Sequence, residues 1–440
     1  MVIVVGTETS DGDWWTWWSD RLGDADEERP GSVGRSRVAG PGASRSTGAE
    51  EPVTWFIPRA TMDRLVRSLQ AAVPGYGPDD RLRAGLLAQA CEEWALVSRL
   101  ARALLPEPLR RRLLDGEPLR LLPAPAAAAV PWELLPLGAE PDAPRLVERT
   151  TVSLVPPTVR RDVDPGVTAA RWEECCELPP LYVVDPTTPA GSVLADPGPW
   201  QARAQTGLRG LGPGGAVAAL IDRRWLSQAL PGRSRLLYVG HVAQAGDDPA
   251  SAGLALGCST SLWSADPQPY RGRLLLTAAD LVRGSRGATG ARDEQLPQAA
   301  WGPDGLVEVD GSRLWPMPPR VGLVACRSGD DLSHPEPFGL VTAVIDAGAE
   351  TVVATRWSLL SDTGYQLLGA GEAAFARLAE AVDEVLVAAD PARALAQVQR
   401  DWLDRWRRTG ALEHAPSGWA ALTTYQAWQA PEEPEGEVSR

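Results

Sequence analysis

The sequence contains no lysine and no asparagine among its 440 residues. Every basic side chain other than the three histidines is therefore arginine, which is typical of genomic base-composition bias. Without asparagine the chain has no N-glycosylation site and cannot form the Cys-His-Asn arrangement of papain-like enzymes. Any group that orients a catalytic histidine must then be a carboxylate or a backbone carbonyl.

Cysteine is scarce as well, with five residues in the chain. Cys91, Cys175, Cys176 and Cys258 show neither C-x-x-C spacing nor a histidine placed for zinc, so we expect structural thiols and no metal site. A G-x-G-x-x-G match at residues 210–215 follows polar sequence and contains a proline, so we expect a loop there. The sequence therefore predicts no cofactor.

Long apolar runs are also missing. No stretch of about 18 apolar residues could span a bilayer, and Met1-Val2-Ile3 does not begin a basic-apolar-small signal peptide. The net charge of −14 argues against nucleic acid as a partner. Unpatterned cysteines fit a reducing compartment, so we expect a cytoplasmic protein with enough apolar sequence for a sizeable core.

The chain divides into regions of contrasting composition. Residues 1–20 form a Trp-rich N-terminal segment; packing of the tryptophans at 14–18 on the domain is favoured over an exposed surface for a partner or membrane. Residues 21–52 have little apolar content and predict a disordered linker. Leucines at helical spacing predict a helical bracing region over 53–117, and residues 431–440 predict a disordered acidic tail.

Two short apolar runs end in reactive side chains. Leu236 to Val239 leads through Gly240 to His241, and Val321 to Ala325 leads to Cys326. Both runs precede polar sequence with Gly and Asp, which predicts buried parallel strands that end at loops. Because ligands bind outside the carboxyl ends of strands in an open α/β sheet, the His and the Cys would face one crevice. A small buried thiol and a histidine that satisfies a carbonyl remain open as alternatives.

The sequence around Cys326 also carries a family motif. Val321 to Trp357 contains a strand, the Cys, a Gly-bearing loop, a Glu-Pro-x-Gly-Leu helix start, an Ala-Gly-Ala helix end and Val-Val-Ala-Thr-x-Trp. Further landmarks follow the order of the same family: Leu119 to Pro125, Val130 to Leu135, Leu146 to Pro156, Leu181 to Pro186, a short helix over Leu274 to Leu281, and a closing Trp-Ala strand at Ser417 to Ala421. Over residues 118–428 the chain resembles the CHAT family of caspase-like proteins, and we expect a domain spanning 118–430.

The strand pattern and the resemblance predict the same fold class. We expect an α/β fold with a caspase-like, doubly wound, mainly parallel sheet flanked by helices. Its strands are predicted at 181–184, 236–239, 322–325 and 351–354, and helices are predicted at 363–387 and 391–406.

The resemblance implies a catalytic dyad in which Cys326 is the nucleophile and His241 is its base. The backbone amides of Val242 and Cys326 would bind the oxyanion. The chain departs from the family at Val242, because relatives usually carry glycine directly after the histidine. Val324 stands where metacaspase-like relatives place an acid, so this position does not favour cleavage after Arg or Lys.

Three carboxylates are candidates for an orienting group or a substrate pocket. Asp247 and Asp248 follow His241 and could orient it, although paired acids in loops commonly form solvated turns. Asp362 lies about one residue later than the acid that reaches the substrate pocket in relatives, and the other interpretation is a helix N-cap before Thr363.

The resemblance implies a cysteine endopeptidase, a hydrolase that cleaves a protein or peptide substrate through a thioester acyl-enzyme. A regulatory partner or sensor would switch it on. Two alternatives stay open: a catalytically silent caspase-like interaction module, and a cysteine hydrolase or acyltransferase that acts on small amides.

Overall fold

The computed structural model describes residues 1–19, 52–76, 81–156, 170–188, 191–207, 221–243, 249–257, 269–270, 273–284, 310–326, 337–371 and 373–428. Asp247, Asp248, Cys258, the glycine motif at 210–215, the acidic tail and all but residue 52 of the expected linker lie outside these residues.

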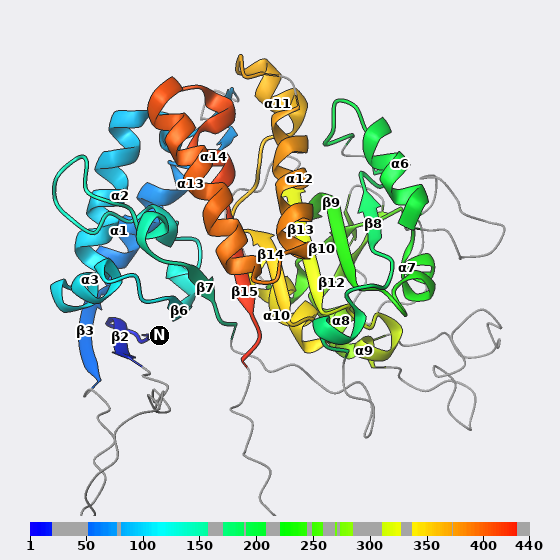
Figure 1. Ribbon diagram of the computed structural model, residues 1–440, viewed down its shortest axis with the longest axis horizontal. Helices are drawn as coiled ribbons and strands as arrows, with labels where there is room; N and C mark the ends of the chain where they lie inside the picture. The colour runs from blue at the N-terminus through cyan, green and yellow to red at the C-terminus, as the bar shows by residue number, and fades with distance from the viewer. Residues whose placement is uncertain are drawn as a thin grey trace, which may run out of the picture.

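Strands of the described residues form one 13-stranded mixed sheet (Figure 1). Its order is β11-β12-β10-β9-β13-β14-β15-β7-β6-β1-β2-β3, and β8 pairs with β9. The strands are β1 (Val2–Glu8), β2 (Gly12–Ser19), β3 (Val53–Pro58), β6 (Leu119–Leu122), β7 (Val152–Leu154), β8 (Leu181–Val184), β9 (Arg235–Ala243), β10 (Gly253–Ala255), β11 (Pro269–Tyr270), β12 (Arg273–Thr277), β13 (Arg320–Cys326), β14 (Thr351–Thr355) and β15 (Leu422–Gln426). A separate pair joins β4 (Gly75–Tyr76) to β5 (Leu82–Arg83).

Helices cover this sheet along its whole length (Figure 1). They are α1 (Arg59–Gln70), α2 (Ala90–Leu104), α3 (Glu107–Leu114), α4 (Leu146–Arg149), α5 (Trp172–Cys175), α6 (Gly198–Gly207), α7 (Arg223–Ala229), α8 (Ala278–Arg283), α9 (Gly311–Leu314), α10 (Pro337–Asp346), α11 (Asp362–Leu367), α12 (Ala374–Val387), α13 (Pro391–Thr409) and α14 (Pro416–Trp419). Short 3-10 turns include η3 (Trp132–Leu134) and η6 (Leu412–His414).

The predicted parallel core is confirmed. β8, β9, β13 and β14 run parallel in that spatial order, and they start within two residues of the predicted positions. β9 extends four residues beyond its predicted end, so that it includes His241, and β13 includes Cys326. Strands buried on both faces read as continuous apolar runs, which is why these four were visible in the sequence.

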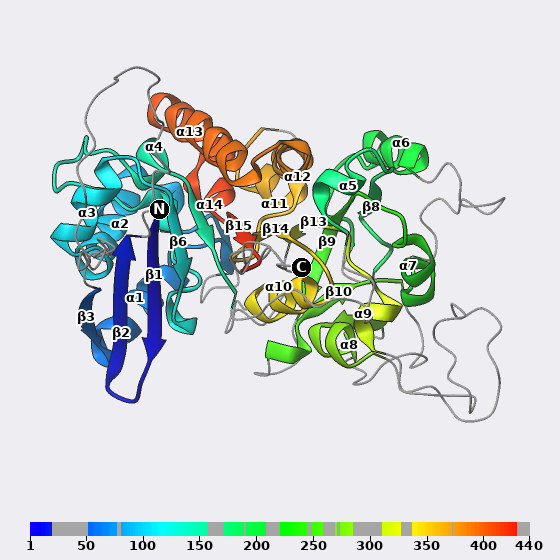
Figure 2. The same ribbon diagram turned by 60° about the horizontal axis from the view of Figure 1, so that its bottom comes forward.

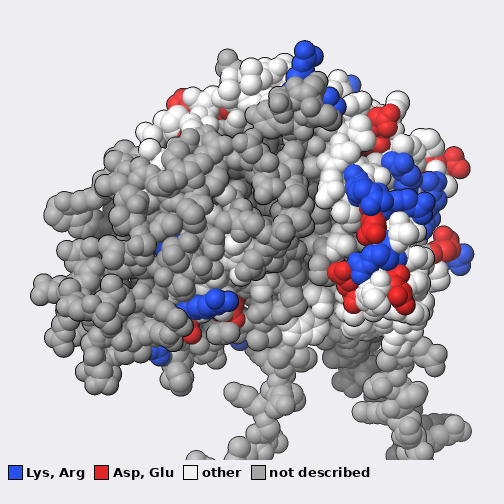
Figure 3. Space-filling model, turned by 180° about the vertical axis from the view of Figure 1, so that it is seen from behind, with Lys and Arg blue, Asp and Glu red and all other residues white. Residues whose placement is uncertain are grey.

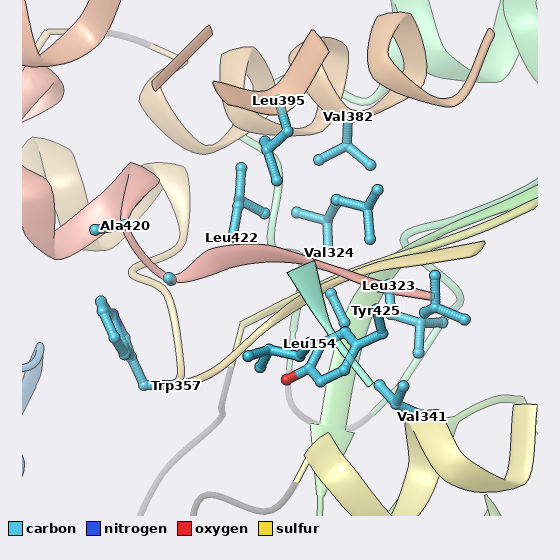
Figure 4. Close-up of a cluster of buried hydrophobic side chains, with 14 of the residues drawn as sticks. Leu154, Leu323, Val324, Val341, Trp357, Val382, Leu395, Ala420, Leu422 and Tyr425 are labelled. Carbon is cyan, nitrogen blue, oxygen red and sulfur yellow. The ribbon is translucent and has the colours of Figure 1, made fainter. Parts of the chain in front are cut away.

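Core side chains fill both faces of the sheet around β13 (Figure 4). Val324 lies on the side of Val382 in α12, whereas Leu323 lies on the side of Val341 in α10 (Figure 4). All four of these side chains are buried. A Cβ on Gly322 would lie 2.9 Å from both Leu386 and Val382, so α12 packs directly against this strand. Gly322 and Val324 of β13 therefore lie on the α12 face of the sheet.

The N-terminal residues differ from the prediction, because they belong to the sheet. β1 pairs in parallel with β6 and antiparallel with β2, and β3 forms the edge beyond β2 (Figure 2). The region expected to be helical over 53–117 therefore begins with a strand and continues with α1, α2 and α3. Trp15 and Trp17 are buried against the domain as favoured, whereas Trp14 is 50% exposed. Alternation along a strand sends successive side chains to opposite faces, so one cluster contributes both to the core and to the surface.

Two further expectations need correction. Ser417 to Ala421 does not form the closing strand, because α14 occupies Pro416–Trp419 and β15 begins at Leu422. Pro416 stands at the first helical position, where its fixed φ favours a helix start. Leu274 to Leu281 is strand β12 followed by helix α8, with Thr277 as the N-cap between them.

The described surface of the N-terminal region carries charges of both signs. Arg side chains lie among acidic ones at the right of Figure 3, which is the end that carries α1 to α3 in Figure 1. Arg111 pairs there with Glu107 at 3.1 Å, and Arg112 pairs with Glu117 at 3.5 Å. Among the residues that the structure describes, no helix has the length and apolarity needed to cross a membrane.

Candidate functional site

Cys326 and His241 are register partners on neighbouring parallel strands. β13 pairs with β9 over seven residues, and the last pair of this ladder is Cys326 with His241. Strands in a sheet lie about 4.8 Å apart, and register partners share one face. The two residues thus lie side by side at the carboxyl ends of their strands, where the sequence placed them.

A backbone carbonyl contacts the imidazole of His241. Nε2 of His241 lies 3.0 Å from the carbonyl oxygen of Gly191, and the histidine is 4% exposed. Because a carbonyl only accepts hydrogen bonds, this contact assigns a proton to Nε2. In the neutral ring Nδ1 then carries the lone pair. A carbonyl was one of the two groups expected to orient the histidine, but no sequence pattern identified Gly191 as its source.

Val242 lies in regular strand backbone directly after the histidine. It pairs with Leu254 of β10, so its backbone is extended. The Val239 carbonyl faces β8, where it accepts from the Asp185 N–H at 2.7 Å. Backbone groups in a strand alternate between its two edges, so the Val242 N–H points to the other edge, toward the end of β13. A valine can supply an amide here without the freedom of glycine.

The side chain of Tyr238 leaves no space for a Cβ at position 240, so glycine is required there. A Cβ at Gly240 would lie 2.8 Å from the Tyr238 hydroxyl oxygen and 3.0 Å from its ring. Tyr238 is fully buried, and its hydroxyl lies 2.6 Å from the His241 carbonyl oxygen and 3.0 Å from that of Ala255. The glycine that precedes the histidine thus leaves room for a tyrosine that fixes the end of β9 from the face opposite the imidazole.

The structure places Asp362 in a structural network. Its side chain is 1% exposed, and it is the first residue of α11, whose N-cap is Ser361. Oδ1 accepts from the Phe375 N–H at 2.8 Å, and Oδ2 accepts from the Ala195 N–H at 3.1 Å. The N-cap expected before Thr363 is therefore Ser361, while Asp362 caps the N-terminus of α12 through its side chain.

The chain also contains the remaining carboxylate candidates, Asp247 and Asp248, and two further histidines, His334 and His414. Asp247, Asp248 and His334 fall outside the described residues. His414 lies in η6, where its carbonyl accepts from the indole N–H of Trp419 at 2.9 Å. Burial lowers the pKa of His414.

The chain was compared with family models, curated protein sequences and solved structures, and the family model agrees with the motifs in the sequence. A family model, the CHAT domain, matches residues 95–427, a stretch that begins within α2 and upstream of the expected start at 118. A search of curated protein sequences finds no match. Among solved structures, the chain is similar to one in the Saccharomyces cerevisiae separase–securin complex, with 11% sequence identity and a TM-score of 0.31. That match covers 84% of this chain and 22% of the other, so this chain spans about a fifth of its length.

Proposed function

The chain belongs to the CHAT domain family, and on that premise we propose that it is a cysteine endopeptidase in which Cys326 is the nucleophile and His241 the general base. The observation that carries the proposal is the register pairing of these two residues at the carboxyl ends of β13 and β9. A cysteine and a histidine at the ends of adjacent strands supply the two groups that covalent acyl transfer by a thiol requires.

The proposed reaction begins with activation of the thiol. An unperturbed thiol has a pKa of roughly 8.5 and is mostly protonated at neutral pH, so it needs a base. Nδ1 of His241 takes the proton, since Nε2 is turned to the Gly191 carbonyl. The thiolate forms a bond to the substrate carbonyl carbon, and the electron pair of that carbonyl moves to its oxygen.

The second half of the reaction reverses the roles of these groups. The tetrahedral intermediate expels the amine, which takes the proton from His241, and a thioester on Cys326 remains. His241 then removes a proton from water, the hydroxide attacks the thioester, and the carboxylic acid leaves as the thiol is reprotonated. The backbone amides of Val242 and Cys326 supply the oxyanion contacts, each worth on the order of a hundredfold in rate.

The substrate in this proposal is a protein or peptide, and a regulatory partner controls access to the dyad, as the family resemblance implies. The described part of the site gives no support for recognition of a basic side chain. Val324 is fully buried, and the carboxylate oxygens of Asp362 accept from backbone amides.

The test is labelling with a panel of peptide acyloxymethyl ketones, followed by mass spectrometry to identify the modified residue. We expect modification of Cys326 in the wild type, none in Cys326→Ala, and a large loss in His241→Ala. The exposed Cys91 serves as an internal reference for general thiol reactivity.

Three results would reject the proposal. Equal labelling of Cys326 in the wild type and in His241→Ala would show that the two residues do not act as a dyad. Absence of labelling in folded protein, with cell lysate added as a source of activator, would favour a binding module without turnover. Turnover of small amides without peptide cleavage would favour the hydrolase or acyltransferase alternative.

A further inference from the structure

A short loop carries the carbonyl that contacts His241. Gly191 lies in the connection between β8 and α6 with φ +88°, and its carbonyl oxygen lies 3.0 Å from Nε2 of His241. A Cβ at this glycine would meet no atom within 4 Å, so the residue is needed for its backbone conformation and not for space. Val193 and Leu194 follow, and both are buried. The position of the carbonyl therefore depends on what fixes this loop.

Asp185 fixes the loop from the end of β8. It directly follows the strand, and its φ of +49° lies in the left-handed region that Asp tolerates better than most residues. Oδ1 accepts from the Val193 N–H at 3.0 Å, and Oδ2 accepts from the hydroxyl of Ser192. The Asp185 N–H donates to Val239 at 2.7 Å, so the residue is itself anchored to the strand that carries His241.

Asp362 holds the same loop from the opposite side. Its backbone N–H donates to the Val193 carbonyl at 3.0 Å, and its Oδ2 accepts from the Ala195 N–H at 3.1 Å. Val193 therefore has its N–H bound to one aspartate and its carbonyl bound to the other. Two carboxylates thus restrain the residues next to Gly191.

We propose that Asp185 is a positioning residue for His241: its carboxylate fixes Ser192 and Val193 and so holds the Gly191 carbonyl against Nε2. Asp362 acts with it as the second restraint on the loop. The inference rests on the proposed function, because the carbonyl fixes the tautomer in which Nδ1 of His241 carries the lone pair that would accept the Cys326 proton. The role is indirect, since no contact joins either carboxylate to the imidazole among the described interactions.

The substitutions test the role of the Asp185 carboxylate separately from that of the positive φ at this position. Asp185→Gly removes the carboxylate and tolerates the positive φ. Asp185→Asn keeps an acceptor for the Val193 N–H and an amide that can donate to Ser192, so it should restore function. Asp390→Gly is the matched control, because Asp390 also accepts from one backbone N–H, that of Arg393, at the start of α13.

The first readout is the state of the imidazole, which does not depend on activity. The chain has three histidines, so ¹⁵N spectra of the imidazoles are simple, and His334→Gln and His414→Gln assign them. We expect His241 to be the Nε2–H tautomer in the wild type, in Asp185→Asn and in Asp390→Gly. In Asp185→Gly we expect this preference to be lost.

The second readout is the rate at which a peptide acyloxymethyl ketone alkylates Cys326. Displacing an orienting group by about 1 Å slows catalysis on the order of 100-fold, so we expect Asp185→Gly to slow labelling about 10- to 100-fold. In the His241→Ala background the same substitution should have no further effect. A purely structural role would lower the rate in both backgrounds. If Asp185→Gly does not fold, Ser192→Ala provides a second test, because it removes the hydroxyl that donates to Asp185. We expect it to slow labelling of Cys326 less than Asp185→Gly would, and only when His241 is present.

The two proposals fail in different ways. Labelling of Cys326 that does not need His241 would reject the dyad, whatever the imidazole spectra show. An unchanged His241 tautomer and an unchanged labelling rate in folded Asp185→Gly would reject the positioning role while the dyad stands.

Discussion

Glu133 and Arg356 form a bidentate ion pair in the interior of the protein. Nη1 of Arg356 lies 2.6 Å from Oε2 of Glu133, and its Nη2 lies 2.7 Å from Oε1. The side chain of Arg356 is 0% exposed and that of Glu133 is 3% exposed, and Thr423 donates to the same carboxylate at 3.1 Å. Glu133 lies in η3 and Arg356 follows β14, so the pair joins two of the sequence landmarks across 223 residues.

Removal of one partner of this pair should destabilise the protein strongly. Glu133→Ala leaves the Arg356 guanidinium buried without its counter-charge, and we expect a loss of about 3–5 kcal/mol in the free energy of unfolding. Urea denaturation followed by tryptophan fluorescence measures it. Glu107→Ala, which breaks the exposed pair with Arg111, should change stability by less than about 0.5 kcal/mol. Equal effects of the two substitutions would contradict this assignment.

The tryptophans of β2 should differ sharply in their contribution to stability. Trp15 is fully buried and lies 5.6 Å, between ring centroids, from Trp132 and 6.0 Å from Trp55. Trp15→Ala should therefore cost about 3–5 kcal/mol. Trp14→Ala removes a half-exposed ring beside Phe56 and should cost about 1 kcal/mol or less. Thermal and urea unfolding of both variants provide the comparison, and similar losses would mean that β2 does not pack as described.

Asp13 makes stability depend on pH in the direction opposite to a salt-bridged carboxylate. Burial raises its pKa, as do Glu8 and Asp63, whereas Arg59 lowers it. The folded state then binds the proton more tightly than the unfolded state, so stability falls as pH rises from the ordinary carboxyl pKa of 3.8 through the raised value. Above that range the charged, buried Asp13 destabilises the fold.

Asp13→Asn should consequently be more stable than the wild type at neutral pH, and the gain should shrink as pH falls toward roughly 4. Urea midpoints at a series of pH values measure both effects. Asp404→Asn, at an exposed position on α13, is the control and should leave the pH profile unchanged. A gain from Asp13→Asn that does not vary with pH would show that the charge of Asp13 is not its cause.

Gly240→Ala should disturb the end of β9 through Tyr238. The new Cβ would lie 2.8 Å from the Tyr238 hydroxyl oxygen, so the ring must move and its hydrogen bonds to the His241 and Ala255 carbonyls are strained or lost. We expect a loss of about 1–3 kcal/mol in stability and slower labelling of Cys326. Gly364→Ala in α11 is the comparison, because its Cβ would lie 3.4 Å from Leu360. A wild-type labelling rate in Gly240→Ala would show that Tyr238 does not control the position of His241.

Much of the fold could be predicted because buried strands have a recognisable local sequence pattern. The four parallel core strands are covered on both faces, so each is a continuous apolar run, and the polar residues after them mark the strand ends. The same pattern placed His241 and Cys326 at neighbouring ends. The motif at 321–357 added the family, which the family model confirms.

The place of the N-terminal strands in the sheet was harder to predict, because they join it through a pairing that is distant in the sequence. β1 pairs with β6, where the register partner of Val2 is Leu119. A Trp-rich segment can be an exposed patch or part of a core until that pairing is known. The prediction of a closing strand at Ser417 to Ala421 was wrong for a local reason, because Pro416 starts a helix where the motif suggested a strand.

Apolar patterning and residue type are local properties, so the amino-acid sequence was enough to predict the α/β core, its strand ends and the two residues proposed for chemistry. Two contacts became visible only in the folded protein: the Gly191 carbonyl meets His241, and the Asp362 carboxylate accepts from the backbone amides of Ala195 and Phe375. Every residue has a carbonyl, so no pattern marks the one that will orient an imidazole 50 positions away. That contact exists only because packing brings a loop, fixed by Asp185 and Asp362, to the end of β9.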